Sequence, residues 1–234
     1  AEAAKQGLAN TLMEKVVSLQ PAAVTLLEEQ YRMNEQIMGY PSRVFYNDSL
    51  KAHHSVAHHL LFEEDKPFQF IDTAGCGFDE VPEGTSSTNP EEASFLIRQI
   101  SHLAEEIMKR SIDPFPSVAI IAPYKEQTYL LAEQLDHSPA LSSYRDRIAV
   151  NTVDSFQGQE RDIIYISLTR SNPDGTIGFL IDIRRMNVAM TRARKKLVMI
   201  GDSATLSRFP FYAGLIHYAE TQGAYYSAWE FMDL

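Results

Sequence analysis

Short apolar runs alternate along this chain with segments of helical periodicity. Most of the runs are apolar throughout rather than at every second position, as expected for strands whose two faces are both covered. Six runs are predicted to be strands: Val24–Leu27, Phe68–Ile71, Val118–Ala122, Ile148–Val153, Ile163–Leu168 and Leu197–Ile200.

The clearest helix signal follows Asn89, which is a typical N-cap residue before Pro90 at the first helical position. Glu92 is placed to complete a capping box, and apolar residues then recur at helical spacing up to the Asp113-Pro114 pair. Three more helices are predicted. One follows Pro123, one covers Ile183–Arg194, and one lies within the aromatic tail Phe209–Leu234.

Strands that alternate with helices predict an α/β fold with a mostly parallel, doubly wound sheet and helices on both faces. Two polar segments, Gly75–Thr88 and Ser138–Arg147, are expected to be loops, the first of them mobile.

The composition is that of an ordinary globular protein, with 44% hydrophobic and 22% charged residues among 234. No apolar run approaches the roughly 18–20 residues of a membrane-spanning helix, and we expect no membrane partner. Cys76 is the single cysteine, so an internal disulfide is impossible and a reducing, cytoplasmic setting is expected. The first residues show no signal-peptide pattern and no initiator Met, which suggests a piece of a longer chain.

The net charge of −10 argues against a general binder of polyanions. The cations are unevenly distributed, however, because the segment from Arg184 to Lys196 holds six of them and no acid. A basic stretch on an acidic body predicts one local anion site rather than a wide basic face.

Two arginines of this stretch, Arg185 and Arg192, are seven positions apart and would share a face of the predicted helix. A guanidinium is always charged, and its planar fork of donors matches phosphate oxygens. Two arginines placed from different segments are suited to clamp a transferring phosphoryl group.

The segment 157–160 follows the fourth predicted strand, and ligands of open α/β sheets gather beyond the carboxyl ends of strands. Gly158 permits close approach of the backbone there. Glu160 is suited to accept a hydrogen bond from a ribose hydroxyl. Thr152 and Ser155 carry short hydroxyl side chains that suit the phosphate oxygens of a nucleic-acid strand.

A phosphate-cradling loop is missing, because no G-x-x-x-x-G-K-[ST] sequence occurs and Gly77 to Gly84 has the wrong spacing and no Lys. No acidic stretch of the Walker B type ends a strand before Gln30 either. Groups that hold the triphosphate and Mg²⁺ are therefore expected on another segment.

Four motifs occur in the order and spacing of the C-terminal motifs of superfamily 1 helicases, which this chain resembles from about Leu27 to Asp202. The nearest branch includes the nonsense-mediated-decay RNA helicase and the replication helicase–nuclease. The motifs are Gln30-Tyr31-Arg32-Met33, Ala122-Pro123-Tyr124, Val153 to Glu160 (VDSFQGQE) and Asn187 to Arg194 (NVAMTRAR).

The resemblance implies a RecA-like P-loop NTPase fold that lacks its own P-loop. Residues 1–23 would be the linker and helix from the preceding motor domain, and residues 24–234 the second RecA-like domain. Arg32 and Arg192 would be arginine fingers, Glu160 would contact the ribose, and Gln157 and Gly158 would line the nucleotide cleft. Contacts to the strand would come from Pro123, Tyr124, Thr152, Ser155, Arg170 and Asn172.

The function implied by this resemblance is an ATP-dependent helicase that travels 5′ to 3′ on a single strand. ATP and Mg²⁺ would be held mainly by the first RecA-like domain of the same chain. This segment alone is therefore expected to be inactive. The residues do not distinguish DNA from RNA, although the motifs favour DNA slightly. The alternative is a non-catalytic nucleic-acid or protein docking module with a motor fold, which the acidic balance and the missing P-loop would suit.

Several residues have simpler interpretations. Arg32 would pair with the acids at 28–29 if it were structural, and Glu160 with Arg161 or Arg185.

Tyr124 suits a packed core as well as a strand contact. Arg185 and Arg194 suit structural roles as well as phosphate steering. His54 and His58 would share a helix face, but no cysteine supports them and no metal site is predicted.

Overall fold

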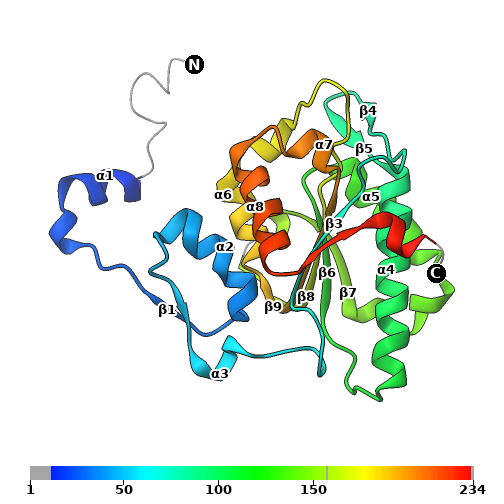
Figure 1. Cartoon of the computed structure of the whole chain (residues 1–234), viewed down its shortest axis with the longest axis horizontal. Coiled ribbons are helices and arrows are strands. Elements are labelled where there is room, and N and C mark those ends of the chain that lie inside the picture. Colours follow the sequence, from blue (N-terminus) through cyan, green and yellow to red (C-terminus); the bar gives the residue numbers. More distant parts are fainter. Residues whose placement is uncertain (1–11, 157, 233–234) are drawn as a thin grey trace.

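The computed structural model describes residues 12–156 and 158–232, which form a six-stranded sheet flanked by helices (Figure 1). The strand order is β10-β3-β9-β8-β6-β7, and every neighbouring pair is parallel. The strands are β3 (Phe68–Asp72), β6 (Val118–Ala122), β7 (Ile148–Thr152), β8 (Arg161–Ser167), β9 (Ala193–Gly201) and β10 (Tyr225–Ser227).

Helices cover both faces of this sheet. One face packs against α4 (Pro90–Lys109) and α5 (Lys125–Asp136), and the other against α2 (Glu35–Tyr46), α6 (Ile183–Met190) and α8 (Pro210–Thr221). Alternate residues of β6, β8 and β9 enter the two cores, and all five residues of β6 are buried as a result. The predicted fold class is confirmed, and the double burial explains why the strands are apolar throughout.

Shorter elements complete the chain. β1 pairs with β2 in parallel, and β4 pairs with β5 as an antiparallel hairpin inside the predicted mobile loop. Their bounds are α1 (Leu12–Leu19), η2 (Pro21–Ala23), β1 (Glu29–Gln30), β2 (Lys51–Ala52), α3 (His54–Ala57), β4 (Val81–Glu83), β5 (Ser86–Thr88), η3 (Pro139–Arg147), η4 (Asp154–Phe156), η5 (Gly178–Ile181), α7 (Ser203–Leu206) and η6 (Ala228–Phe231).

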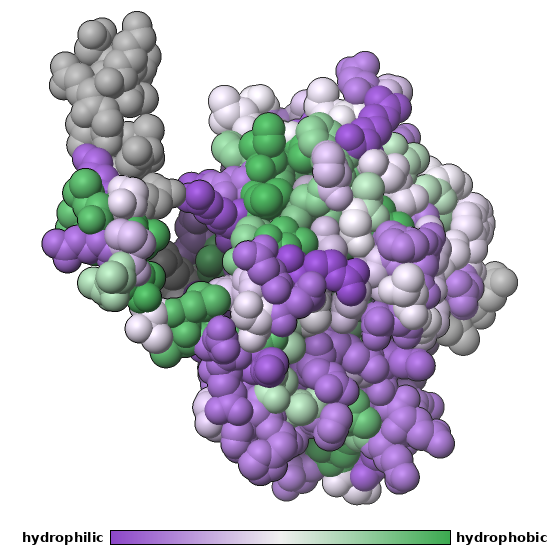
Figure 2. Space-filling view, turned by 60° about the vertical axis from the view of Figure 1, so that its left-hand side comes forward, coloured by the Kyte–Doolittle hydropathy of each residue, from purple (hydrophilic) through white to green (hydrophobic). Residues whose placement is uncertain are grey.

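The predicted strand Val24–Leu27 is wrong. This segment has no regular structure and belongs to an arm that carries α1 apart from the sheet. Figure 2 shows hydrophobic residues gathered on this arm, and Leu27 is 79% exposed. An apolar run becomes a strand only where a neighbouring strand accepts its backbone hydrogen bonds, and no strand formed by the described residues pairs with this run.

The predicted helix Ile183–Arg194 is too long. α6 ends at Met190, where the Thr191 hydroxyl donates to the Asn187 carbonyl at 2.8 Å, and β9 begins at Ala193. Arg192 therefore lies on a tight turn, and the shared helical face with Arg185 does not exist. The tail helix is confirmed as α8, whereas the edge strand β10 that follows it was not predicted.

Candidate functional site

The predicted site residues lie at opposite ends of the sheet. Arg161 of β8 pairs with Ala193 of β9, so Glu160 and Arg192 lie side by side where these two strands begin. Glu160 was expected at the carboxyl end of β7, and that placement is wrong because the chain after β7 returns to the amino end of the sheet. Gln157 lies outside the described residues.

At this amino end, three arginines surround one carboxylate, and we call Arg32, Arg192, Arg194 and Glu160 the arginine cluster. The Arg32 Nε donates to Glu160 Oε2 at 2.5 Å, and its Nη1 donates to the Thr191 carbonyl at 3.1 Å. Arg194 Nε lies 3.9 Å from Glu160 Oε1. Three cations and one acid leave an excess of positive charge, as a site for an anion requires.

Arg32 is held by a turn that Gln30 organises. The Gln30 side-chain oxygen accepts from the backbone N–H groups of Arg32 and Met33 at 2.8 and 2.7 Å. The backbone N–H of Asn34 donates to the Arg194 carbonyl at 3.0 Å, which ties this turn to β9. The expected alternative of a pair between Arg32 and the acids at 28–29 is not formed, because Glu29 instead accepts from the Tyr31 hydroxyl.

Arg192 is the member of the cluster whose charge is least compensated. Its Nε is buried and has no hydrogen-bond partner among the residues that the structure describes, while its carbonyl accepts from the Arg161 N–H at 3.1 Å. Burial, with the nearby charge of Arg32, lowers the pKa of Arg192 below its usual range, and Glu160 opposes this shift. An anionic acceptor would satisfy the remaining hydrogen-bond donor of this half-buried guanidinium. Gly158 has a φ of +84° and open space beside it, so a ligand can approach its backbone.

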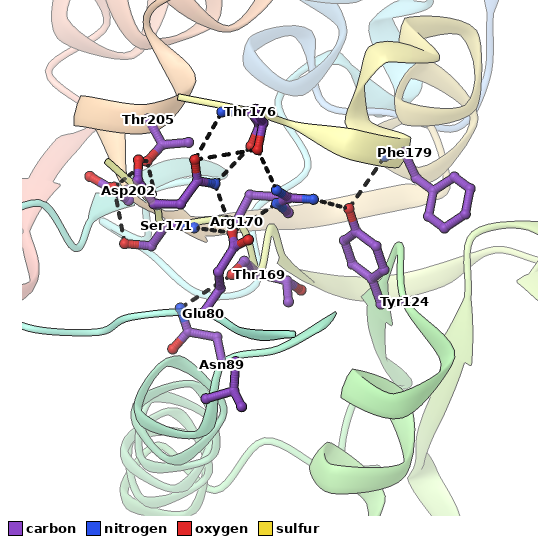
Figure 3. Close-up of polar contacts among 12 residues, drawn as sticks. Glu80, Asn89, Tyr124, Thr169, Arg170, Ser171, Thr176, Phe179, Asp202 and Thr205 are labelled. Carbon is purple, nitrogen blue, oxygen red and sulfur yellow. Dashed lines mark hydrogen bonds and ion pairs between the residues drawn. The ribbon is translucent and has the colours of Figure 1, made fainter. Parts of the chain in front are cut away.

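At the carboxyl ends of the strands, Arg170 forms the centre of a second polar cluster (Figure 3). It donates to Glu80 at 2.8 Å, to the Tyr124 hydroxyl at 2.9 Å and to the Thr176 hydroxyl at 2.7 Å. Asn172 also donates to Glu80 and exchanges hydrogen bonds with Thr176. The side chains of Arg170 and Asn172 are thus engaged within the chain, and Tyr124 is only 3% exposed.

The remaining predicted strand contacts lie beside this cluster, around a small cleft lined in part by Pro123 and Thr152. Thr152 and the exposed Ser155 share a hydrogen bond of 2.9 Å between their hydroxyls. Arg185 lies at the cleft between Asp154 and Asp182, at 3.3 and 3.4 Å. The structure therefore brings all six predicted strand contacts to the carboxyl ends of β6, β7 and β8.

Comparison with known proteins identifies the family of this chain. A family model described as an AAA domain matches residues 8–204. The chain belongs to this family, as the C-terminal region of a superfamily 1 helicase.

Relatives of this helicase domain include DNA-binding protein SMUBP-2 of Mesocricetus auratus, which is 36% identical over 99% of this chain and 24% of its own length. An uncharacterised ATP-dependent helicase of Methanocaldococcus jannaschii is 34% identical over 92% of this chain and 32% of its own. This domain spans about a quarter of the SMUBP-2 chain. A solved C-terminal domain of a possible DNA helicase from Lactobacillus plantarum covers 85% of this chain and 99% of its own, with a TM-score of 0.47 and 13% identity.

A buried network that the sequence analysis missed supports the loop after β8 in this helicase domain. Glu92 Oε1 accepts from the Ser167 hydroxyl at 2.5 Å and from the Thr169 N–H at 2.9 Å. The predicted capping box is therefore wrong, because the Asn89 N–H donates to Gln127 instead of Glu92. Thr169 adopts a φ of +68°, which is rare for a β-branched residue, and the network holds it there.

Glu80 was also missed, because a single acid in a polar loop carries no distinguishing signal. It accepts hydrogen bonds from Arg170, Asn172 and the Ser171 N–H, and so it ties the 75–88 segment to the loop after β8. Within the described residues of this helicase domain, no group of three His, Cys, Asp or Glu side chains is placed to hold a metal ion. No helix there has the length and apolar character to cross a bilayer.

Proposed function

We propose that this domain supplies Arg32 and Arg192 to an ATP site completed by a preceding RecA-like domain of the same chain. The observation that carries the proposal is the buried Nε of Arg192, which lacks a partner within residues 12–156 and 158–232 and lies in a cluster of excess positive charge. Guanidinium groups so placed stabilise the charge that develops on a transferring phosphoryl group. ATP and Mg²⁺ would be held mainly by the other domain, and this segment alone would be inactive.

Glu160 would hold Arg32 near the site and accept a hydrogen bond from the ribose of the nucleotide. Its two oxygens contact Arg32 and Arg194, while a large part of its side chain is exposed to a neighbouring domain or ligand. Gln157 and Gly158 would line the same cleft, and the positive φ of Gly158 supports a close approach of its backbone.

The single strand would run along the carboxyl ends of β6, β7 and β8. Pro123, Thr152 and Ser155 would contact it directly, while Tyr124, Arg170 and Asn172 would act mainly by shaping the surface beneath it. We favour DNA as the strand, since SMUBP-2 is described as DNA-binding. Travel from 5′ to 3′ and a cytoplasmic location stay predictions from the family resemblance and the single cysteine.

The finger assignment is tested by Arg192→Ala in a protein that contains both motor domains. ATPase activity stimulated by single-stranded DNA should fall by about 10³-fold or more, because the charge on the phosphoryl group loses a stabilising partner. Arg192→Lys should recover little activity, since an ammonium lacks the planar fork. The matched control is Arg43→Ala, which removes an exposed arginine of α2 whose nearest acid, Asp48, lies at 4.0 Å.

The control variant should retain wild-type activity. The measurement is the steady-state rate of ATP hydrolysis at saturating DNA, for the wild type and the three variants. Unchanged ATPase in Arg192→Ala would show that Arg192 is not a finger.

A further inference from the structure

Phe179 is a large aromatic residue that this fold leaves on the surface. It is 53% exposed, although its neighbours Ile177 and Leu180 are buried. Phe179 is a lining residue of two hollows at the carboxyl end of the sheet. One is a cavity of about 490 Å³ against the β4–β5 hairpin and Arg170. The other is the small cleft that contains Pro123 and Thr152.

The backbone that presents Phe179 is fixed on both sides. Its own N–H donates to the Tyr124 hydroxyl at 3.3 Å, and the next carbonyl, of Leu180, accepts from the Tyr212 hydroxyl at 2.9 Å. Gly178 has a φ of +51°, and a Cβ there would lie 2.2 Å from the Tyr124 hydroxyl, so only glycine fits. A ring on so rigid a support loses little conformational freedom when a ligand binds.

The ring extends away from the Arg170 cluster, with its centroid 5.3 Å from that of Tyr124 and the two planes at 50° (Figure 3). One edge of the Phe179 ring therefore packs against Tyr124, and the remainder of the ring is open to a ligand.

The larger cavity has the chemistry of a base site rather than a phosphate site. Its one acid, Glu80, is paired with its one cation, Arg170, so that no net charge remains in the lining. The hairpin contributes the hydroxyl residues Thr85, Ser86 and Ser87, which suit the polar edges of bases. Aromatic side chains that stack on bases are common in proteins that bind single strands.

We propose that Phe179 stacks on a nucleobase of the single strand and directs that base into the cavity beside the β4–β5 hairpin. This inference rests on the proposed function, because it assumes that a strand runs along the carboxyl end of the sheet. It adds a gripping residue and a base-binding cavity to the contacts predicted from the motifs, in a region where Arg170 and Asn172 are already engaged within the chain.

The test compares binding of a labelled oligothymidylate with binding of an abasic strand of equal length at low salt. Phe179→Ala should bind the oligothymidylate about tenfold more weakly or worse and lose the preference for the base-bearing strand. Phe179→Trp should retain both, since a larger ring stacks equally well. The matched control is Ile181→Ala, because Ile181 is 70% exposed in the same η5 segment but lines neither hollow.

Thermal unfolding of each variant shows whether the exposed side chain was removed without loss of the fold. Equal binding by Phe179→Ala and the wild type would overturn the inference. A wild-type chain that binds both strands equally would also overturn stacking, while it would leave phosphate contacts along the proposed track intact. Failure of the wild-type chain to bind either strand would instead contradict the strand track of the proposed function.

Discussion

Glu92 is fully buried between α4 and the sheet, where one of its oxygens is hydrogen-bonded and the other, Oε2, has no partner in the described part of the chain. Burial raises the pKa of this carboxyl to about 7, although the hydrogen bonds from Ser167 and Thr169 oppose the shift. The ordinary value is 4.5, so the folded state binds this proton more tightly than the unfolded state. The resulting stabilisation is complete below about pH 4.5 and is lost as the pH rises through about 7.

Glu92→Gln should therefore remove the pH dependence that Glu92 gives to the stability of the domain, while the shape of the side chain is kept. Above pH 7 the variant should be more stable than the wild type, by on the order of 2–3 kcal/mol, because a buried charge is replaced by a neutral amide. Below about pH 5 the two should converge. Urea unfolding at a series of pH values measures this, and parallel stability curves for both proteins would contradict a neutral Glu92.

At the scale of secondary structure, the start of α4 joins three segments that are distant in sequence. Asn89 caps the helix by accepting from the Glu92 N–H at 3.0 Å. Its side-chain amide also donates to the carbonyls of Phe78 and Thr169, at 2.9 and 3.2 Å. The helix terminus therefore holds the segment before the β4–β5 hairpin against the loop that carries Arg170.

Asn89→Ala should destabilise the domain by about 2–4 kcal/mol, since it removes a cap and leaves buried carbonyls without their donor. Asn89→Ser is the comparison, because its hydroxyl can cap the helix but is too short to replace both amide bonds. The serine variant should fall between the alanine variant and the wild type in denaturant midpoint. If Asn89→Ala lowered the free energy of unfolding by less than about 0.5 kcal/mol, the hydrogen bonds of the Asn89 side chain would contribute little to stability.

At the scale of the whole molecule, the arginine cluster and the proposed strand track are separated by the length of the central strands. β8 begins next to Glu160 and ends next to the loop that carries Arg170, and its seven residues span roughly 20 Å. The parallel sheet thus connects the end that carries the arginine cluster to the end proposed to carry the strand track. Opening and closing of a cleft at the first end would move the second end as a unit.

The isolated chain should show no ATPase activity, with or without single-stranded DNA, because it carries the proposed fingers but no phosphate-cradling loop. Its binding to a single strand should be weak and should decrease as salt increases. Phosphate release and fluorescence anisotropy over a salt series measure the two properties. The isolated chain would contradict this prediction if it hydrolysed ATP in response to single-stranded DNA and Arg192→Ala abolished that activity.

The sequence by itself determined the fold class and the family. Strands buried on both faces must be apolar throughout, so five of the six predicted strands were recognisable without tertiary information. Four ordered motifs were specific enough to indicate a superfamily 1 helicase, and by resemblance they predict Arg32 and Arg192 as arginine fingers. These inferences depend on residue type and local spacing, which the sequence states directly.

Only the tertiary structure decided which side chains meet. Arg32 and Glu160 are 128 positions apart, and their contact depends on the path of the chain from β7 back to the start of β8. Glu92 carried a local capping signal, yet long-range bonds to Ser167 and Thr169 replaced it. The apolar run at 24–27 stayed outside the sheet because a strand requires a neighbour, and neighbours are assigned by the fold rather than by the run itself.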